Sequence, residues 1–282
     1  MFQKIYIMKY INLKIPEHSY FFGFAQTDGS LTKSSRNRGK LQIEINKTDL
    51  HILKSFKNLF PKIYCSISER IRSTNFKKNY ISYVIAMFDK KFRDEINKLG
   101  VPYGKKSEII SPPTGNFCKK DYIRGLIDGD GSLGITKKGL PFISISLKSE
   151  ELKNYLCETI EGITGERKRL ARNKRDSIYN IMVNREKAQQ FIRYLYYPGC
   201  LALNRKLKKA QEALRWKRPK TLKRTSKKFW EPMEDKYILN HSVKESRNYL
   251  KRTARSLKMR LWRLKNHKAS YLKACLSQAE II

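Results

Sequence analysis

The sequence predicts an α+β protein in which one αββαββα unit occurs twice in tandem, followed by a small all-helical domain. Three observations support this prediction. An apolar run that ends in Asp-Gly-Ser occurs at residues 20–30 and again at 122–132. Similar strand and helix patterns follow each copy in the same order. After a basic linker, the C-terminal residues show the patterns of short helices.

Each apolar run carries small residues on one face of a predicted helix. Gly125 and Gly129 are four residues apart in the second run. Gly23 and Thr27 hold the matching positions in the first run. Small residues on one face allow two helix backbones to approach closely, as they do in membranes. We therefore expect the two helices to pack on each other at Gly23 and Gly125.

An aspartate ends each predicted helix, Asp28 in the first run and Asp130 in the second. Packing of the helices would place the two carboxylates side by side, where they repel each other unless a cation lies between them. Oxygen ligands suit a hard cation such as Mg²⁺, and we expect Mn²⁺ to substitute for it. Asp-Gly after an apolar run is also an ordinary helix end, but two copies in matching contexts favour a site.

In the first half, residues 1–110, the pattern after the apolar run is typical of two strands, a helix, two strands and a helix. Residues 41–46 alternate between apolar and polar side chains, which predicts a half-buried strand. Thr48 and Asp49 offer an N-cap to the helix that follows. The later elements are predicted as strands at 63–70 and 80–88 and a closing helix at 89–99.

The second half, residues 111–214, repeats this order. Residues 142–147 alternate in the same way, and Ser149 with Glu150 offers the next N-cap. The later elements are predicted as a very basic strand or loop at 167–175, a strand at 177–184 and a helix at 187–196. Lys206 lies 76 residues after Asp130, as Lys106 lies 78 residues after Asp28, so each half supplies one Asp and one Lys.

The composition favours a protein that binds nucleic acid. The chain of 282 residues has 61 Lys and Arg against 25 Asp and Glu, a net charge of +36. Such a charge attracts polyanions, with an anionic membrane surface as the rival partner. No apolar run approaches the ~20 residues that span a bilayer, which argues against an integral membrane protein. The five scattered cysteines indicate a reducing compartment, cytoplasmic or an organellar matrix.

The chain resembles the single-chain LAGLIDADG homing endonucleases over residues 15–214. Residues 123–131 (IRGLIDGDG) match the nine-residue signature closely, and residues 21–29 (FFGFAQTDG) match it loosely. The resemblance implies a pseudo-twofold fold in which the two signature helices form the central interface. Two curved antiparallel sheets would straddle the major groove of double-stranded DNA. The chain departs from the signature at Gln26, where the second copy has Asp128.

The same resemblance implies roles for particular residues. Asp28 and Asp130 would be the catalytic acids that bind metal, assisted by the main-chain carbonyls of Thr27 and Gly129. Lys106 and Lys206 look like the basic residues of the family's active site, with Lys105 as an alternate for the first. The expected reaction is a staggered double-strand break with short 3′ overhangs, made by a monomer.

Polar side chains on strands are candidates for base contacts, and basic side chains are candidates for phosphate contacts. The strand candidates are Gln42, Glu44, Ser144 and Ser146. The basic candidates are Arg36, Arg38, Arg70, Arg72, Arg167, Arg169 and Arg172. Alternation alone does not fix which strand face meets DNA. A charge run is usually a solvated face, but the large positive excess favours DNA contact here.

Beyond residue 214 we expect a basic linker (215–229), a helix-turn-helix domain (230–268) and a tail (269–282). Ser242 and Thr253 offer N-caps to the last two helices. The Trp-x-Pro-x-Glu-Asp pattern from Trp230 and the Arg-Leu-Trp-Arg-Leu close resemble Myb/SANT-type domains. Trp230 and Trp262 are expected in the core, and a basic hairpin docked on the main domain is the alternative. The groove-facing candidates are Arg255, Ser256, Lys258, Met259 and Arg263.

A site-specific DNA endonuclease with an added DNA-binding module, of the kind that supports intron homing, is the leading functional hypothesis. The second is a non-catalytic transcription regulator. Some bacterial transcription factors resemble a degenerate LAGLIDADG pair joined to a helix-turn-helix, but they lose the catalytic acids that this chain keeps. The third is a maturase that assists splicing of a group I intron, with intron RNA as its partner.

Overall fold

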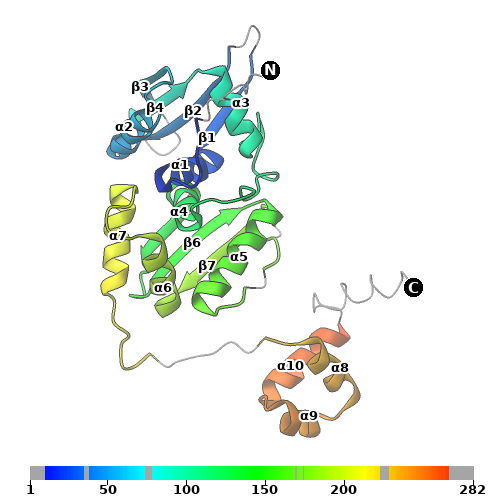
Figure 1. The fold of residues 1–282 in the computed structure, drawn as a ribbon. Helices are drawn as coiled ribbons and strands as arrows, with labels where there is room; N and C mark the ends of the chain where they lie inside the picture. The colour runs from blue at the N-terminus through cyan, green and yellow to red at the C-terminus, as the bar shows by residue number, and fades with distance from the viewer. Residues whose placement is uncertain are drawn as a thin grey trace, which may run out of the picture. The chain divides into compact units, whose positions relative to one another are not determined.

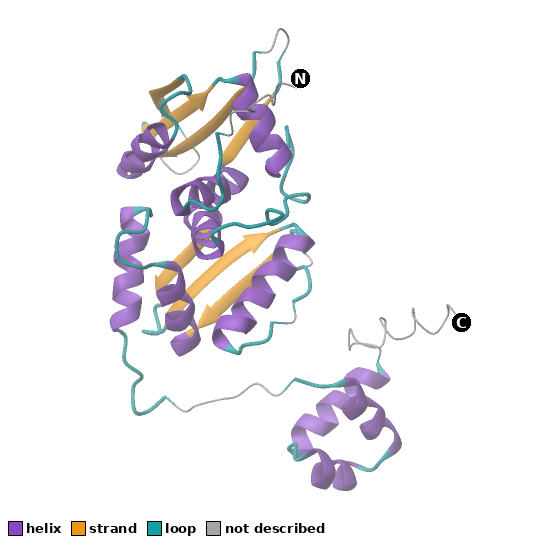
Figure 2. Cartoon of the chain, in the orientation of Figure 1, coloured by secondary structure: helices purple, strands orange, loops and turns teal. Residues whose placement is uncertain are grey.

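The computed structural model describes residues 10–34, 38–73, 78–168, 170–173, 175–222 and 229–266. The chain forms two compact units, residues 1–218 and residues 219–282. The larger unit combines helices with two antiparallel sheets, and the smaller one is helical, so the protein is α+β (Figures 1 and 2). Within the described residues, no helix has the length and apolarity to cross a membrane.

The first half of the larger unit is built on a four-stranded antiparallel sheet with the strand order β1-β2-β4-β3. Its elements are α1 (Pro16–Thr27), β1 (Gly29–Thr32), β2 (Lys40–Asn46), the 3₁₀ helix η2 (Lys47–Asp49), α2 (Leu50–Leu59), β3 (Cys65–Arg72), β4 (Tyr80–Met87) and α3 (Lys90–Leu99). The predicted alternation along β2 is confirmed. Leu41, Ile43 and Ile45 are buried, and Gln42 and Glu44 lie on the opposite face.

The second half is built on a three-stranded antiparallel sheet with the order β5-β6-β7. Its elements are α4 (Lys119–Asp130), β5 (Gly131–Ile135), β6 (Pro141–Leu147), α5 (Glu150–Thr164), β7 (Tyr179–Asn184), α6 (Arg185–Leu195) and α7 (Asn204–Arg215). Ser149 Oγ accepts the N–H of Leu152, so α5 begins at the predicted cap. α7 is a helix that no pattern above predicts.

The predicted αββαββα order is wrong for this second half, because the described residues between 165 and 178 form no strand. The segment is dense in Lys and Arg, and like charges placed opposite each other weaken strand pairing. Instead, the Lys168 side chain donates from Nζ to the main-chain carbonyl of Met182 in β7, at 2.6 Å. Duplication of one unit stays a prediction.

α1 and α4 pack against each other between the two sheets and form the helix seam (Figure 1). Gly23 and Gly125 lie where the two backbones are closest. A Cβ on Gly23 would lie 2.2 Å from the carbonyl oxygen of Tyr122. A Cβ on Gly125 would lie 2.2 Å from that of Tyr20. The backbones are therefore too close to admit a side chain at either position.

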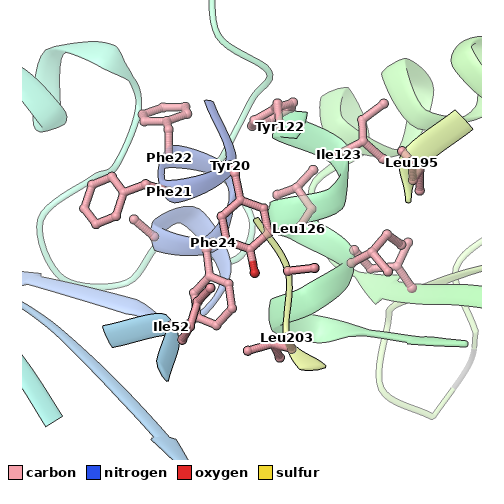
Figure 3. Close-up of a cluster of buried hydrophobic side chains, with 14 of the residues drawn as sticks. Tyr20, Phe21, Phe22, Phe24, Ile52, Tyr122, Ile123, Leu126, Leu195 and Leu203 are labelled. Atoms are coloured by element: carbon pink, nitrogen blue, oxygen red, sulfur yellow. The ribbon is translucent and has the colours of Figure 1, made fainter. Parts of the chain in front are cut away.

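Two reciprocal hydrogen bonds cross the helix seam. Tyr20 of α1 donates from its hydroxyl to Asp128 of α4 at 2.8 Å, and Figure 3 shows the Tyr20 ring between the two helices. Tyr122 of α4 donates to Gln26 Oε1 of α1 at 2.6 Å. Asp128 also accepts the N–H of Leu203 at 2.8 Å. Gln26 and Asp128, which differ between the two copies of the signature, are thus buried bonding partners within the fold.

The core beside α1 is aromatic. Phe21 and Phe24 pack on Phe56 of α2, with ring centroids 5.0 and 5.5 Å apart. Figure 3 shows Phe24 next to Ile52 of the same helix. These contacts tie α1 to α2 of the same half, and so help to position the helix end that precedes Asp28.

The smaller unit contains α8 (Pro232–Asn240), α9 (Val243–Leu250) and α10 (Ala254–Lys265). Ser242 Oγ accepts the N–H of Glu245, and Thr253 Oγ1 accepts that of Ser256. The two predicted N-caps are therefore confirmed. Each cap satisfies backbone N–H groups that the first turn of a helix leaves without an intrahelical partner.

The core of the smaller unit is narrow. It consists of Ile238, Leu250, Leu257 and Leu264, with Trp230 packed against it. Trp262 is 48% exposed, so the prediction that it belongs to the core is wrong. The two core leucines of α10 already occupy the face that meets α8 and α9, and Trp262 lies to the side of that face.

Candidate active site

Asp28 and Asp130 lie together at the C-terminal ends of the two seam helices. Asp28 follows α1 directly, and Asp130 is the last residue of α4. Gly129 brings α4 against α1, since a Cβ built on it would lie 3.5 Å from the carboxyl carbon of Asp28. The charge of Asp130 raises the pKa of Asp28, so the carboxylates are close enough to repel each other.

The surroundings hold both carboxyl pKa values above their ordinary range. Burial is the largest cause and raises the pKa of Asp28 to about 6, with Asp130 second and nearby cations opposing. Loss of water around Asp130 also raises its pKa, against the charges of Lys106 and Lys206. No described residue donates a hydrogen bond to either carboxylate. Among the described residues, the carboxylate oxygens are thus available to a cation.

Lys106 and Lys206 are anchored on the ends of the two helices in the same way. Lys106 Nζ donates to the carbonyl of Gly29, and Lys206 Nζ donates to that of Gly131 at 2.9 Å. Each also donates to the carbonyl three residues before the aspartate. For Lys106 this is the carbonyl of Ala25, at 3.0 Å, and for Lys206 that of Ile127, at 2.6 Å. Burial lowers the pKa of both lysines to about 8, although the nearby aspartates oppose this shift. Lys105, the alternate candidate, is exposed.

The two lysines differ in how many donors they have left. An ammonium group has three N–H donors. Lys206 is 4% exposed, and it also donates to the carbonyl of Asp128 at 2.6 Å. Its donors are thus taken by main-chain carbonyls, whereas Lys106 donates to two. Lys206 would therefore act on a substrate through its charge, and Lys106 keeps a donor that a phosphate or a water could accept.

The oxygen donors at this end of the helix seam fit a divalent cation such as Mg²⁺ or Mn²⁺. Asp28 and Asp130 directly follow Thr27 and Gly129, and the Thr27 hydroxyl is turned back to the Phe24 carbonyl at 2.9 Å. The Gly129 carbonyl accepts from Lys206 Nζ at 3.5 Å. The described residues include no cluster of three or more His, Cys, Asp or Glu side chains that could hold a metal. Mg²⁺ bound by one or two carboxylates usually keeps several waters or takes phosphate oxygens. The arrangement suits a metal shared with a phosphate substrate.

A hollow of about 300 Å³ opens beside Asp28, and Asp49, Arg72 and Arg205 are among the residues that line it. The sequence patterns missed Asp49 and Arg205 as site residues. Asp49 holds the predicted N-cap position of α2, but its side chain makes no capping hydrogen bond. The carboxylate instead accepts a hydrogen bond from Arg205 Nε at 2.8 Å. The one signal that could have indicated Arg205 is its place next to Lys206.

The open face of the first sheet carries a charged cluster. Glu44 on β2 forms ion pairs with Arg70 and Arg72 of β3, both at 2.9 Å. Ser82 of β4 donates to the same carboxylate at 2.6 Å. Gln42 lies two residues before Glu44 on β2, so the two side chains point to the same face of the sheet. Four of the predicted contact residues are thus gathered on one open surface.

The open face of the second sheet carries hydroxyl and amide groups. Ser144 and Ser146 lie on β6, opposite in direction to the buried Ile143 and Ile145. Ser146 Oγ donates to Asn180 Oδ1 of β7 at 2.7 Å. The predicted strand candidates of this half therefore lie on the uncovered face as well, but in a neutral setting.

The remaining predicted contact residues are mostly exposed where the structure describes them. Arg38, Arg167 and Arg172 are exposed, and Arg172 lies over the Tyr179 ring at 5.2 Å. Arg36 and Arg169 lie outside the described residues. On α10, the exposed candidates are Arg255, Lys258, Met259 and Arg263, and Ser256 is half-buried.

Solved structures similar to this chain include two homing endonucleases and one DUF199/WhiA protein. I-WcaI bound to its DNA recognition sequence shares 15% identity, with 70% of this chain and 87% of that chain covered, at a TM-score of 0.48. A mesophilic variant of I-DmoI shares 15%, with 68% and 95% covered, at 0.47. Full-length DUF199/WhiA from Thermatoga maritima shares 12%, with 90% and 92% covered, at 0.43.

No protein-family model and no curated protein matches the sequence. The identities and TM-scores of the structural matches are low.

Proposed function

We propose that this protein is a metal-dependent, site-specific DNA endonuclease that cuts both strands of a long asymmetric target. The observation that carries this proposal is the pairing of Asp28 and Asp130, one from each half, with an anchored lysine beside each. Two desolvated carboxylates at close quarters have raised pKa values, and a divalent cation relieves that cost. The same pair would place metal-bound oxygens against a phosphodiester.

Hydrolysis of a phosphodiester requires a water oxygen to bond to phosphorus while the bond from phosphorus to the 3′ oxygen breaks. The water loses one proton and the 3′ oxygen gains one, which leaves a 5′-phosphate and a 3′-hydroxyl. Divalent ions, when bound by Asp28 and Asp130, would supply Lewis acidity and a water of lowered pKa. Lys106 would donate to the phosphate or the water, and the charge of Lys206 would stabilise the negative charge that develops.

Double-stranded DNA is the proposed substrate because of the charge and the open sheet faces. The net charge of +36 supplies sequence-independent attraction. Glu44, Arg70 and Arg72 on one open face, and Ser144 and Ser146 on the other, would meet base edges in the major groove. Because each half supplies one acid, each half would govern one strand, and the products would carry short 3′ overhangs.

A non-catalytic DNA-binding regulator is the second candidate, and the smaller unit is the observation that favours it. Its three capped helices expose Arg255, Lys258 and Arg263 on α10, where they can contact DNA. A module of this kind serves a regulator as well as it serves a nuclease. The two proposals differ in whether Asp28 and Asp130 are needed for activity.

Selection of cleavage sites from a randomised duplex library, with Mg²⁺ and then Mn²⁺, tests the proposal. The wild-type protein should produce double-strand breaks with 3′ overhangs. Asp28→Asn and Asp130→Asn should bind the same duplexes without cutting them. Sequence-specific binding by the wild-type protein without any cutting would support the regulator instead. Stimulated splicing of a group I intron, again without cutting, would support a maturase.

A further inference from the structure

One ion pair joins the two halves of the larger unit beside Asp28. Asp49, at the start of α2, is 2% exposed, and its carboxylate accepts from Arg205 Nε of α7 at 2.8 Å. The Arg205 side chain remains 51% exposed. Both residues line the hollow that also contains Asp28, and the charge of Arg205 acts on Asp28 to lower its pKa. The guanidinium therefore faces the same space as that carboxylate.

The backbone that carries Arg205 is held at several points. The N–H of Leu203 donates to Asp128 at 2.8 Å, and the carbonyl of Ala202 lies 3.2 Å from His51 Nε2. Arg205 itself lies in the first turn of α7. A guanidinium held through Nε retains the N–H groups of both Nη nitrogens, in a planar fork that suits phosphate oxygens. The group is thus oriented before any DNA arrives.

The matching positions in the other half make different contacts. Lys105, which precedes Lys106 as Arg205 precedes Lys206, is exposed. Ser149 holds the N-cap position of α5 that Asp49 holds in α2, and its hydroxyl accepts the N–H of Leu152 and donates to the carbonyl of Ile110 at 2.5 Å. An arginine therefore bridges the two halves beside Asp28, whereas the described residues at the matching positions beside Asp130 make other contacts.

We propose that Arg205, oriented by Asp49, binds a phosphate of the DNA strand that is cut at Asp28 and so favours the cutting of that strand. Arg205 is a phosphate-binding residue in this scheme, and Asp49 is a positioning residue. The inference rests on the proposed endonuclease function and adds to it a residue, its ligand and an inequality between the two strands.

The test is cleavage of a duplex with a different dye on each strand, taken from the sequences that the wild-type protein cuts. Arg205→Ala should slow cutting of one strand by about 10- to 100-fold, the loss expected for one hydrogen bond to a charged group, and leave the other strand nearly unchanged. Asp49→Asn, which keeps the arginine, should slow the same strand by a smaller factor. Lys208→Ala, an exposed position on α7, removes the same charge and should not change the ratio of the two rates.

A merely structural ion pair would lower the melting temperature and slow both strands alike. Equal slowing of the two strands by Arg205→Ala would overturn the proposal. If the wild-type protein cuts neither strand, the endonuclease proposal fails. Phosphate binding by Arg205 is then tested by affinity alone, with a duplex selected by repeated rounds of binding. Arg205→Ala should then reduce the slope of log affinity against log salt by about 1, the effect of one lost phosphate contact. An unchanged slope would overturn the inference on its own.

Discussion

The two halves of the larger unit hold their aspartates in the same frame and surround them differently. In both, a lysine donates to the carbonyl of the residue after the aspartate and to the carbonyl three residues before it. Beside Asp28 lie a hollow, a cross-half ion pair and a charged sheet face. The second sheet offers serine and asparagine at its open face. The shared frame holds the two acids, and the different surroundings would let each half bind its DNA strand in its own way.

Loss of either acid should have the largest effect. Asp28→Asn or Asp130→Asn keeps the shape of the side chain but removes a charge that would hold the proposed metal. We expect each variant to cut DNA at least about 100-fold more slowly, comparable to the removal of one stabilising group from a transition state. Measured affinity for the same duplex should change little. If either variant cuts DNA at the wild-type rate, the two halves do not share one metal centre.

Gly125→Ala should be the next largest effect, because the added Cβ would lie 2.2 Å from the Tyr20 carbonyl oxygen. Overpacking of a close contact costs about 1–3 kcal/mol or more, and we expect the upper part of that range in urea unfolding. Gly162→Ala in α5 is the control, since nothing lies within 4 Å of its Cβ position. It should stabilise the protein by about 0.5–1 kcal/mol. Equal effects at both sites would contradict a close helix seam.

Much of the helix seam could be predicted from the sequence, because its signals are local. Small residues four apart and an aspartate at each helix end are visible in one dimension. The alternation along β2 and β6 likewise fixed which side chains are buried. Thr253 and Ser242 marked helix starts because a cap lies within three residues of the group it binds.

The rest could not be predicted, because it depends on contacts between distant residues or on competition between charges. Asp49 and Arg205 lie 156 residues apart, and a local pattern assigned Asp49 to a helix cap. Residues 167–175 were expected as a strand or a loop, and the described part of this segment forms no strand. Like charges placed opposite each other weaken strand pairing, and no local pattern shows how far they do so. The expectation for Trp262 came with a resemblance to Myb/SANT-type domains, whereas the small core is formed by aliphatic residues with Trp230 packed against them.

A smaller effect should appear in the pH dependence of metal binding at Asp28. Its pKa of about 6 in the folded protein lies above the ordinary value of 3.8. The folded state therefore binds this proton more tightly than the unfolded chain, and stability without metal should rise as the pH falls through that range. Mg²⁺ bound by Asp28, as proposed, would compete with this proton. Mg²⁺ should raise the melting temperature more at a pH above this pKa than below it, and Asp28→Asn should remove the difference.

The smallest effect on stability should come from the charged cluster that distinguishes the first sheet. Arg70 and Arg72 are 47% and 49% exposed, so Glu44→Gln should change stability by less than about 1 kcal/mol. It should, however, release both arginines and alter the base preference at the positions that they contact, as measured by selection of cleavage sites. Ser146→Ala, on the neutral face, should alter base preference less. If Glu44→Gln and the wild-type protein select identical sites, the charged face does not set base preference, and the proposed difference between the two sheet faces is wrong.

The most direct measurement is the anomalous scattering of Mn²⁺ in crystals of the protein grown with the metal. We predict a peak within bonding distance of the carboxylate oxygens of both Asp28 and Asp130, lost in crystals of Asp130→Asn. Mn²⁺ bound to one of these residues without the other, or bound elsewhere while this pair stays free of metal, would contradict a metal site shared by the two halves.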